Sequence, residues 1–94
     1  MPLHLLAKQT VTDTDAFHAS FNAQLPAAEA AGLSLLHLWH DADNPNDIYA
    51  LFTVADRTRA DAFMNDPASI KAGQQATVTD GWATYLTPSP QPRP

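Results

Sequence analysis

The most constraining feature of this sequence is a predicted hairpin whose two segments are apolar on both faces. The segments are Leu33–Asp41 and Ile48–Ala55, and the six residues between them include Asn, Asp and Pro, which favour turns. Alternate residues of a strand point to opposite sides of a sheet, and in both segments each side is mostly apolar. A hairpin of this kind needs cover on both of its faces.

Strict alternation along the first segment assigns its residues to faces. An antiparallel sheet with one solvated face should alternate apolar and polar residues, and here that alternation is missing. The helices of a small domain cover one side only, so we expect a second copy of the same sheet to cover the other in a two-fold homodimer. The alternation places Leu33, Leu35, His37 and Trp39 on one face and Ser34, Leu36, Leu38 and His40 on the other.

A strand followed by a helix is predicted for the first third of the chain. Residues 3–11 form a short apolar run that ends at a polar segment. Thr12 and Asp15 have the spacing of a capping box, which predicts the helix start. Pro26 should kink or restart this helix, and Gly32 should end it. The apolar stripe of the helix consists of Phe17, Phe21 and Leu25.

A second helix is predicted after the hairpin, broken into two parts. Asp56 can cap the first part, and Asp66–Pro67 has the residues of a new cap with proline at the first helical position. Gly73 either ends the second part or lies inside it. Asp80–Gly81 is predicted to form a turn into a last strand over residues 82–86.

The resulting element order, β-α-β-β-α-β, is that of a ferredoxin-like α+β fold, a four-stranded antiparallel sheet with two helices on one face. A chain of 94 residues supports one such domain, predicted over residues 1–87. The proline-rich residues 88–94 are predicted to be a disordered tail.

Composition and charge exclude several classes of partner. The chain has 10 acidic and 5 basic residues, a formal charge of −5, and lacks the basic stripe that nucleic acid binding requires. It has no cysteine, which excludes disulfides and thiolate metal sites, and its apolar runs are too short to cross a bilayer. The start of the chain carries no export signal, so we expect a cytoplasmic protein.

The second half of the hairpin and the helix after it resemble a known family. The residues are Leu51–Asp56, then Ala60, Ala62–Phe63 and Asp66–Pro67. In topology and spacing, Leu3 to Leu86 resembles the dimeric α/β-barrel superfamily, nearest its antibiotic-biosynthesis-monooxygenase-like branch. The resemblance implies a homodimer with two sheets face to face and a ligand cavity between sheet and helices in each subunit. It also implies cofactor-free oxygenation, isomerisation or ligand binding alone, because the fold does not choose among them.

The sequence departs from that branch where polar groups are usual. Members often carry polar or aromatic residues along the third strand and a histidine early in the second helix. The departure weighs against oxygenation at the usual place, so any active site has to be built elsewhere. The corresponding positions here are Ala50, Phe52, Val54 and Phe63.

Histidines and aromatic residues are the candidate site residues. His37 is the candidate catalytic proton acceptor, because strand alternation places it beside Trp39 and Asp41, and a carboxylate can orient an imidazole. The structural alternative is an imidazole hydrogen-bonded within the sheet interface, and for the aromatic residues it is core or dimer packing. The candidate ligand-binding residues are Trp39, Tyr49, Trp82 and His18.

No metal or cofactor is expected from these residues. His37 and His40 are three apart in a strand and point to opposite faces, so they cannot hold one ion unless a bulge intervenes. The expected protein is a small homodimer that binds an apolar or aromatic molecule, with cofactor-independent monooxygenase or isomerase activity as the chemistry to test. The alternative is a non-enzymatic interaction or regulatory module with a filled interior.

Overall fold

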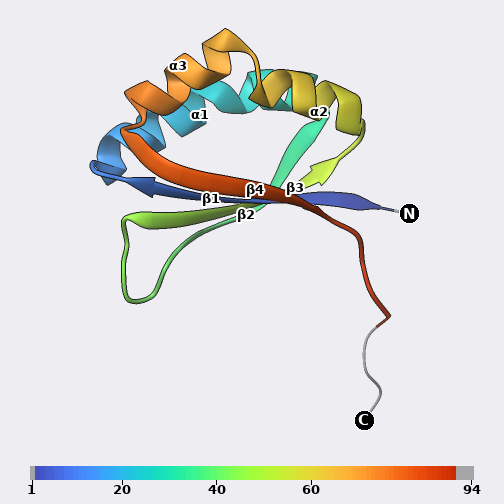
Figure 1. The fold of residues 1–94 in the computed structure, drawn as a ribbon, viewed down its shortest axis with the longest axis horizontal. Coiled ribbons are helices and arrows are strands. Elements are labelled where there is room, and N and C mark those ends of the chain that lie inside the picture. Colours follow the sequence, from blue (N-terminus) through green and yellow to red (C-terminus); the bar gives the residue numbers. More distant parts are fainter. Residues whose placement is uncertain (1, 91–94) are drawn as a thin grey trace.

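In residues 2–90, which a computed structural model describes, four antiparallel strands form one sheet and three helices lie on one side of it (Figure 1). The strand order is β2-β3-β1-β4, which confirms the predicted ferredoxin-like α+β fold. Residues 91–94 of the predicted disordered tail lie outside the described residues. The elements are β1 Leu3–Val11, α1 Thr14–Ala30, β2 Leu33–His40, β3 Asp47–Val54, α2 Arg57–Met64, α3 Pro67–Gln75 and β4 Val78–Leu86.

Helix α1 begins one residue later than the capping box predicts and is not interrupted. Its cap is Asp13, whose carboxylate accepts a hydrogen bond from the Ala16 N–H at 3.1 Å. Pro26 lies inside the helix, so the predicted restart is wrong. Pro26 and Asn22 are both exposed, and water can bond the Asn22 carbonyl that proline leaves without a donor. Gly32 follows with φ +86°, which confirms the predicted left-handed end.

The predicted break of the second helix into two parts is confirmed. The Asp56 carboxylate accepts a hydrogen bond from the Arg59 N–H at 3.2 Å and caps α2. The Asp66 carboxylate accepts one from the Ala68 N–H at 2.8 Å and caps α3, with Pro67 at the helix start. Gly73 lies inside α3 rather than at its end.

Strand β4 begins at Val78, four residues earlier than predicted, so the turn predicted at Asp80–Gly81 is wrong. Gly81 pairs with Gln9, and a Cβ at Gly81 would lie 2.7 Å from the Lys8 carbonyl oxygen. This glycine therefore serves the close approach of β1 and β4 and not a turn.

Strand β2 contains a bulge that changes the predicted face assignment. Leu35 pairs with Phe52 and His37 pairs with Leu51, so Leu36 is an extra residue. After the bulge Leu38 packs against the core under the helices, as Leu35 does before it. The prediction that Leu35 and His37 share a face is therefore wrong, because each residue after the bulge points to the side opposite to the one predicted.

The core lies between the helices and one side of the sheet, which we call the helix side. Phe17 of α1 and Ile48 of β3 are its largest fully buried side chains. The other side carries no helix, and we call it the open face (Figure 1). None of the helices in the described part of the chain is long and apolar enough to span a membrane. Open-face positions include Leu6, Lys8, His37, Trp39, Tyr49, Leu51, Trp82 and Leu86.

Candidate functional site

A cavity of about 520 Å³ lies between the helix side of the sheet and the helices. Helix α1 contributes a row of aromatic and aliphatic side chains, and α3 contributes small residues, which leave room for the cavity. Cavities of this size hold small organic molecules. The apolar lining includes Phe17, Phe21, Leu25, Ala50, Phe52, Phe63, Met64 and Ala72.

Three polar side chains from the helices also line the cavity, namely Ser20 and Gln24 of α1 and Ser69 of α3. The Ser20 hydroxyl donates a 2.9 Å hydrogen bond to the Ala72 carbonyl oxygen and ties α1 to α3. Within residues 2–90, the side chains of Gln24 and Ser69 make no hydrogen bond, so both can bond a ligand. Sequence reasoning missed these residues, although Ser20 and Gln24 flank Phe17 and Phe21 on the same helical stripe.

The side chains that β3 contributes to the cavity are apolar, as the sequence predicts. Ala50 and Phe52 are buried and line it, as does the half-buried Phe63 of α2. Val54 is buried in the core at the end of the same strand. Within residues 2–90, no histidine lines the cavity. Lys8 and Asp80 are the titratable residues that border the cavity within residues 2–90, and both occupy open-face positions of their strands.

Three of the predicted ligand-binding residues form a row across the open face. Trp39 pairs with Tyr49, Tyr49 pairs with Lys8, and Lys8 pairs with Trp82. Among the five predicted site residues, all within the described range, Trp82 alone also borders the cavity. The residues singled out in the sequence therefore lie together, but apart from Trp82 they do not line the cavity that the resemblance implied between sheet and helices.

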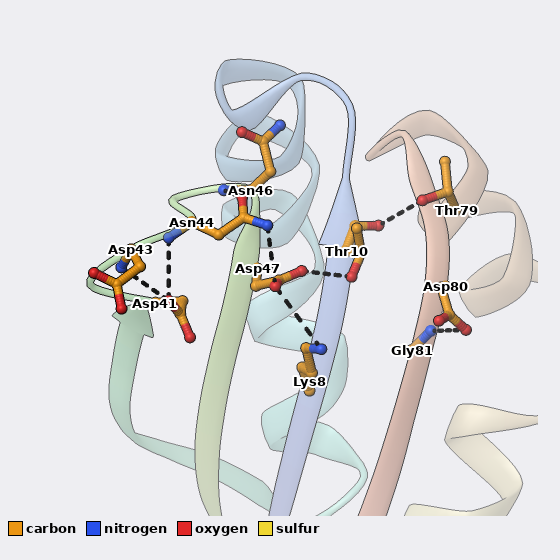
Figure 2. A network of polar contacts seen from close by, with 10 residues as sticks. All are labelled: Lys8, Thr10, Asp41, Asp43, Asn44, Asn46, Asp47, Thr79, Asp80 and Gly81. Atoms are coloured by element: carbon orange, nitrogen blue, oxygen red, sulfur yellow. Dashed lines mark hydrogen bonds and ion pairs between the residues drawn. The ribbon is translucent and has the colours of Figure 1, made fainter.

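The predicted catalytic residue, His37, lies on the open face beside this row. Its ring stacks on Trp39 with centroids 4.9 Å apart and an interplanar angle of 18°. Asp41 is occupied elsewhere, because its carboxylate accepts hydrogen bonds from the N–H groups of Asp43 and Asn44 in the hairpin loop (Figure 2). His37 is thus positioned by an aromatic ring and not by the predicted carboxylate. His18 is on the helix side, where it meets His40.

A polar network closes the hairpin end of the open face (Figure 2). Asp47 accepts a 2.6 Å hydrogen bond from the Thr10 hydroxyl and a 3.3 Å bond from the Asn44 amide. The Lys8 ammonium lies 3.9 Å from the same carboxylate. The lysine in the aromatic row therefore has a counter-charge within its own chain.

Tyr85 joins β4 to α2 on the helix side. Its hydroxyl donates a 2.5 Å hydrogen bond to the Asp61 carboxylate, and the Arg57 guanidinium lies 4.2 Å above its ring. Burial, and after it the hydrogen bond and charge of Asp61, raise the pKa of Tyr85 to about 12. The tyrosine is a hydrogen-bond donor at neutral pH and holds α2 against the sheet.

Among known proteins, this chain is similar to solved structures but not to family models or curated sequences. No family model matches the sequence, and no curated protein matches it. A protein of Bordetella bronchiseptica named as an antibiotic biosynthesis monooxygenase superposes with TM-score 0.77 at 10% identity, over 94% of this chain and 97% of that one. One of Caulobacter crescentus, similarly named, gives TM-score 0.72 at 14% identity, over 95% and 91% of the two chains. The chain therefore has the ferredoxin-like fold of the antibiotic biosynthesis monooxygenase proteins.

Proposed function

We propose that this chain is a homodimer that holds a small, largely apolar or aromatic molecule in the cavity between its sheet and helices. The observation that carries the proposal is the cavity of about 520 Å³, lined by aromatic and aliphatic side chains. Gln24 and Ser69 supply a few polar groups, so a ring with a hydroxyl or carbonyl substituent fits the lining better than a charged ligand.

The homodimer is supported by the open face. Three large apolar side chains are exposed at open-face positions, Trp39 by 46%, Trp82 by 49% and Leu86 by 41%. A patch of this kind on a small domain marks an association surface. A second copy related by a two-fold axis presents the same patch and covers it. The ion pair of Lys8 with Asp47 reduces the cost of burying the lysine in that interface.

The reaction we propose to test is oxygenation of the ligand by O2 without a bound cofactor, carried out by groups other than the third strand, where Ala50, Phe52 and Val54 replace the polar residues usual in the monooxygenase-like branch. Support comes from the solved structures of the same fold that carry the name of a monooxygenase. An electron-rich aromatic ligand can itself supply the electrons for such a reaction, and the protein then contributes orientation and a dry cavity. The role of His37 as proton acceptor remains a prediction and requires a ligand that reaches the open face, because His37 does not line the cavity.

Ligand binding is tested with a pair of substitutions on α3. Gly73 lines the cavity, and a Cβ at this position meets nothing within 4 Å, so Gly73→Leu has open space in which to begin a bulky side chain at the cavity lining. Ala68 is exposed on the same helix and does not line the cavity, which makes Ala68→Leu the matched control. We expect a phenol or quinone to quench tryptophan fluorescence, with at least tenfold weaker binding in Gly73→Leu and unchanged binding in Ala68→Leu. Absence of binding across the panel, or equal affinity in both variants, would contradict the proposal.

The dimer is tested by sedimentation velocity at micromolar concentration. We expect Trp39→Glu to convert the dimer to a folded monomer, because it replaces an exposed aromatic ring of the open face with a charge. Ile70→Glu is the matched control, since Ile70 is also an exposed apolar residue but lies on α3. A wild-type monomer, or equal dissociation by both substitutions, would contradict association through the open face.

A further inference from the structure

Two histidines that are far apart in sequence meet where α1 passes the end of β2. The Nε2 atoms of His18 and His40 are 3.1 Å apart, and the ring centroids are 5.2 Å apart with an angle of 47° between the planes. The bulge at Leu36 creates this meeting, because it turns the later residues of β2 over and brings His40 to the helix side.

The second nitrogen of His40 is anchored to the backbone. Its Nδ1 lies 2.7 Å from the Pro45 carbonyl oxygen in the hairpin loop. A carbonyl only accepts, so Nδ1 carries the hydrogen, and in the neutral ring Nε2 then presents a lone pair. His18 Nε2 supplies the hydrogen of the short contact. The two Nε2 atoms therefore share one hydrogen. When that hydrogen is absent, the lone pairs of both nitrogens point to the same place.

We propose that His18 and His40 together bind a divalent transition metal ion of the Zn²⁺ class. Two ligand atoms about 2.0–2.1 Å from one ion, at angles between square and tetrahedral, lie about 2.9–3.4 Å apart. The Nε2–Nε2 distance of 3.1 Å falls in this range. The bond from His40 Nδ1 to a carbonyl is the outer contact that fixes metal-bound histidines in other proteins. Neutral imidazole suits Zn²⁺, Ni²⁺ and Cu²⁺.

The site has two ligands from the protein. Within residues 2–90, no group of three or more histidine, cysteine, aspartate or glutamate side chains is placed to hold an ion, so water completes the coordination. Such a site is weak and open on its solvent side. Sequence reasoning considered His37 with His40 and excluded a metal because the two point to opposite faces. The pair that forms joins His40 to His18 on another element.

Metal binding would connect this surface pair to the cavity. The His18 ring contacts Phe17 edge-on, with centroids 5.5 Å apart, and Phe17 lines the cavity. An ion shared by α1 and β2 would hold the helix on the sheet at this end, and it would stabilise the folded chain because it binds the native pair and not the unfolded one.

The proposal is tested by titrating the full chain with Zn²⁺ by calorimetry. We expect one saturable site per chain, with affinity at least tenfold lower in His18→Gln and in His40→Gln. His4→Gln is the matched control, because His4 lies in β1 opposite Thr53, away from the pair, and removes a histidine near the start of the chain. Far-ultraviolet circular dichroism verifies that each variant is folded.

A second measurement does not depend on the variants. Two-bond ¹H–¹⁵N spectra of the wild-type imidazoles should show Zn²⁺ shifting the Nε2 signals of both His18 and His40, with His4 and His37 unmoved. Unshifted Nε2 signals in the pair, or unchanged Zn²⁺ affinity in either single variant, would overturn the proposal and leave the contact as a hydrogen bond between two rings.

Discussion

The close approach of β1 and β4 at Gly81 makes a strong prediction about stability. A Cβ added there would lie 2.7 Å from the Lys8 carbonyl oxygen, which is backbone and cannot rotate away. In Gly81→Ala the two strands must separate locally, at a cost of about 1–3 kcal/mol for overpacking. Weakening one ladder hydrogen bond adds about 1 kcal/mol. We therefore expect a loss of about 2–4 kcal/mol in the free energy of unfolding.

Gly73→Ala is the matched control, because it makes the same chemical change in open space. A Cβ at Gly73 meets nothing within 4 Å, and the residue lies inside α3, where glycine is less favourable than alanine by about 0.5–1 kcal/mol. We expect this substitution to stabilise the chain by that amount. The two alanine variants should then differ by about 2.5–5 kcal/mol, which for a chain of this size separates their melting temperatures by about ten degrees or more.

The assay is urea unfolding followed by circular dichroism, at one fixed protein concentration so that association contributes equally. A Gly81→Ala variant as stable as the wild type would refute the reasoning, because it would show that the strands separate at little cost. A destabilised Gly73→Ala variant would refute the second half, since it would show that the space beside α3 is filled.

Two further substitutions test the contacts that hold the helices in place. Asp13→Ala should cost about 1 kcal/mol in urea unfolding, because it removes the side chain that caps α1. Tyr85 should ionise with a midpoint near pH 12 in an absorbance titration, and Asp61→Asn should lower that midpoint. Since the pKa of Tyr85 is higher in the folded chain than its usual value of about 10, its contribution to stability is complete below pH 10 and disappears between pH 10 and 12. An unchanged midpoint in Asp61→Asn would contradict the contribution assigned to Asp61 and leave burial as the cause of the raised pKa.

Local signals predicted most of the fold. Asp56, Asp66 and Gly32 mark helix ends by chemistry that acts within a few residues, and the structure confirms all three. The apolar second face of the hairpin was also readable, because it depends on a simple count of side chains. These features depend only on neighbouring residues and not on how distant segments pair.

Features that depend on pairing between distant strands were not readable. Glycine is favoured both in turns and where two paired strands approach closely. The sequence therefore predicts a turn at Gly81, where the structure has a close approach of β1 and β4. The extra residue at Leu36 has no distinctive sequence, yet it changes the face of every residue after it in β2. The error carried over to the site, because the alternation predicts that His37 and Trp39 share a face with Leu35. The polar residues that line the cavity, Ser20, Gln24 and Ser69, were not predicted.

Both irregularities of the sheet fall on its outermost strands. Leu36 is the extra residue of β2, and Thr79 is the extra residue of β4, where Val11 pairs with Val78 and Thr10 with Asp80. A disrupted ladder is a poor template for another strand, so growth into a continuous ribbon of chains is discouraged at both borders. In the proposed homodimer, self-association would instead use the open face, where two copies cover each other's apolar side chains and leave no surface for a third. Irregular edge strands would thus allow a chain with an exposed apolar sheet face to form a closed dimer without forming fibrils.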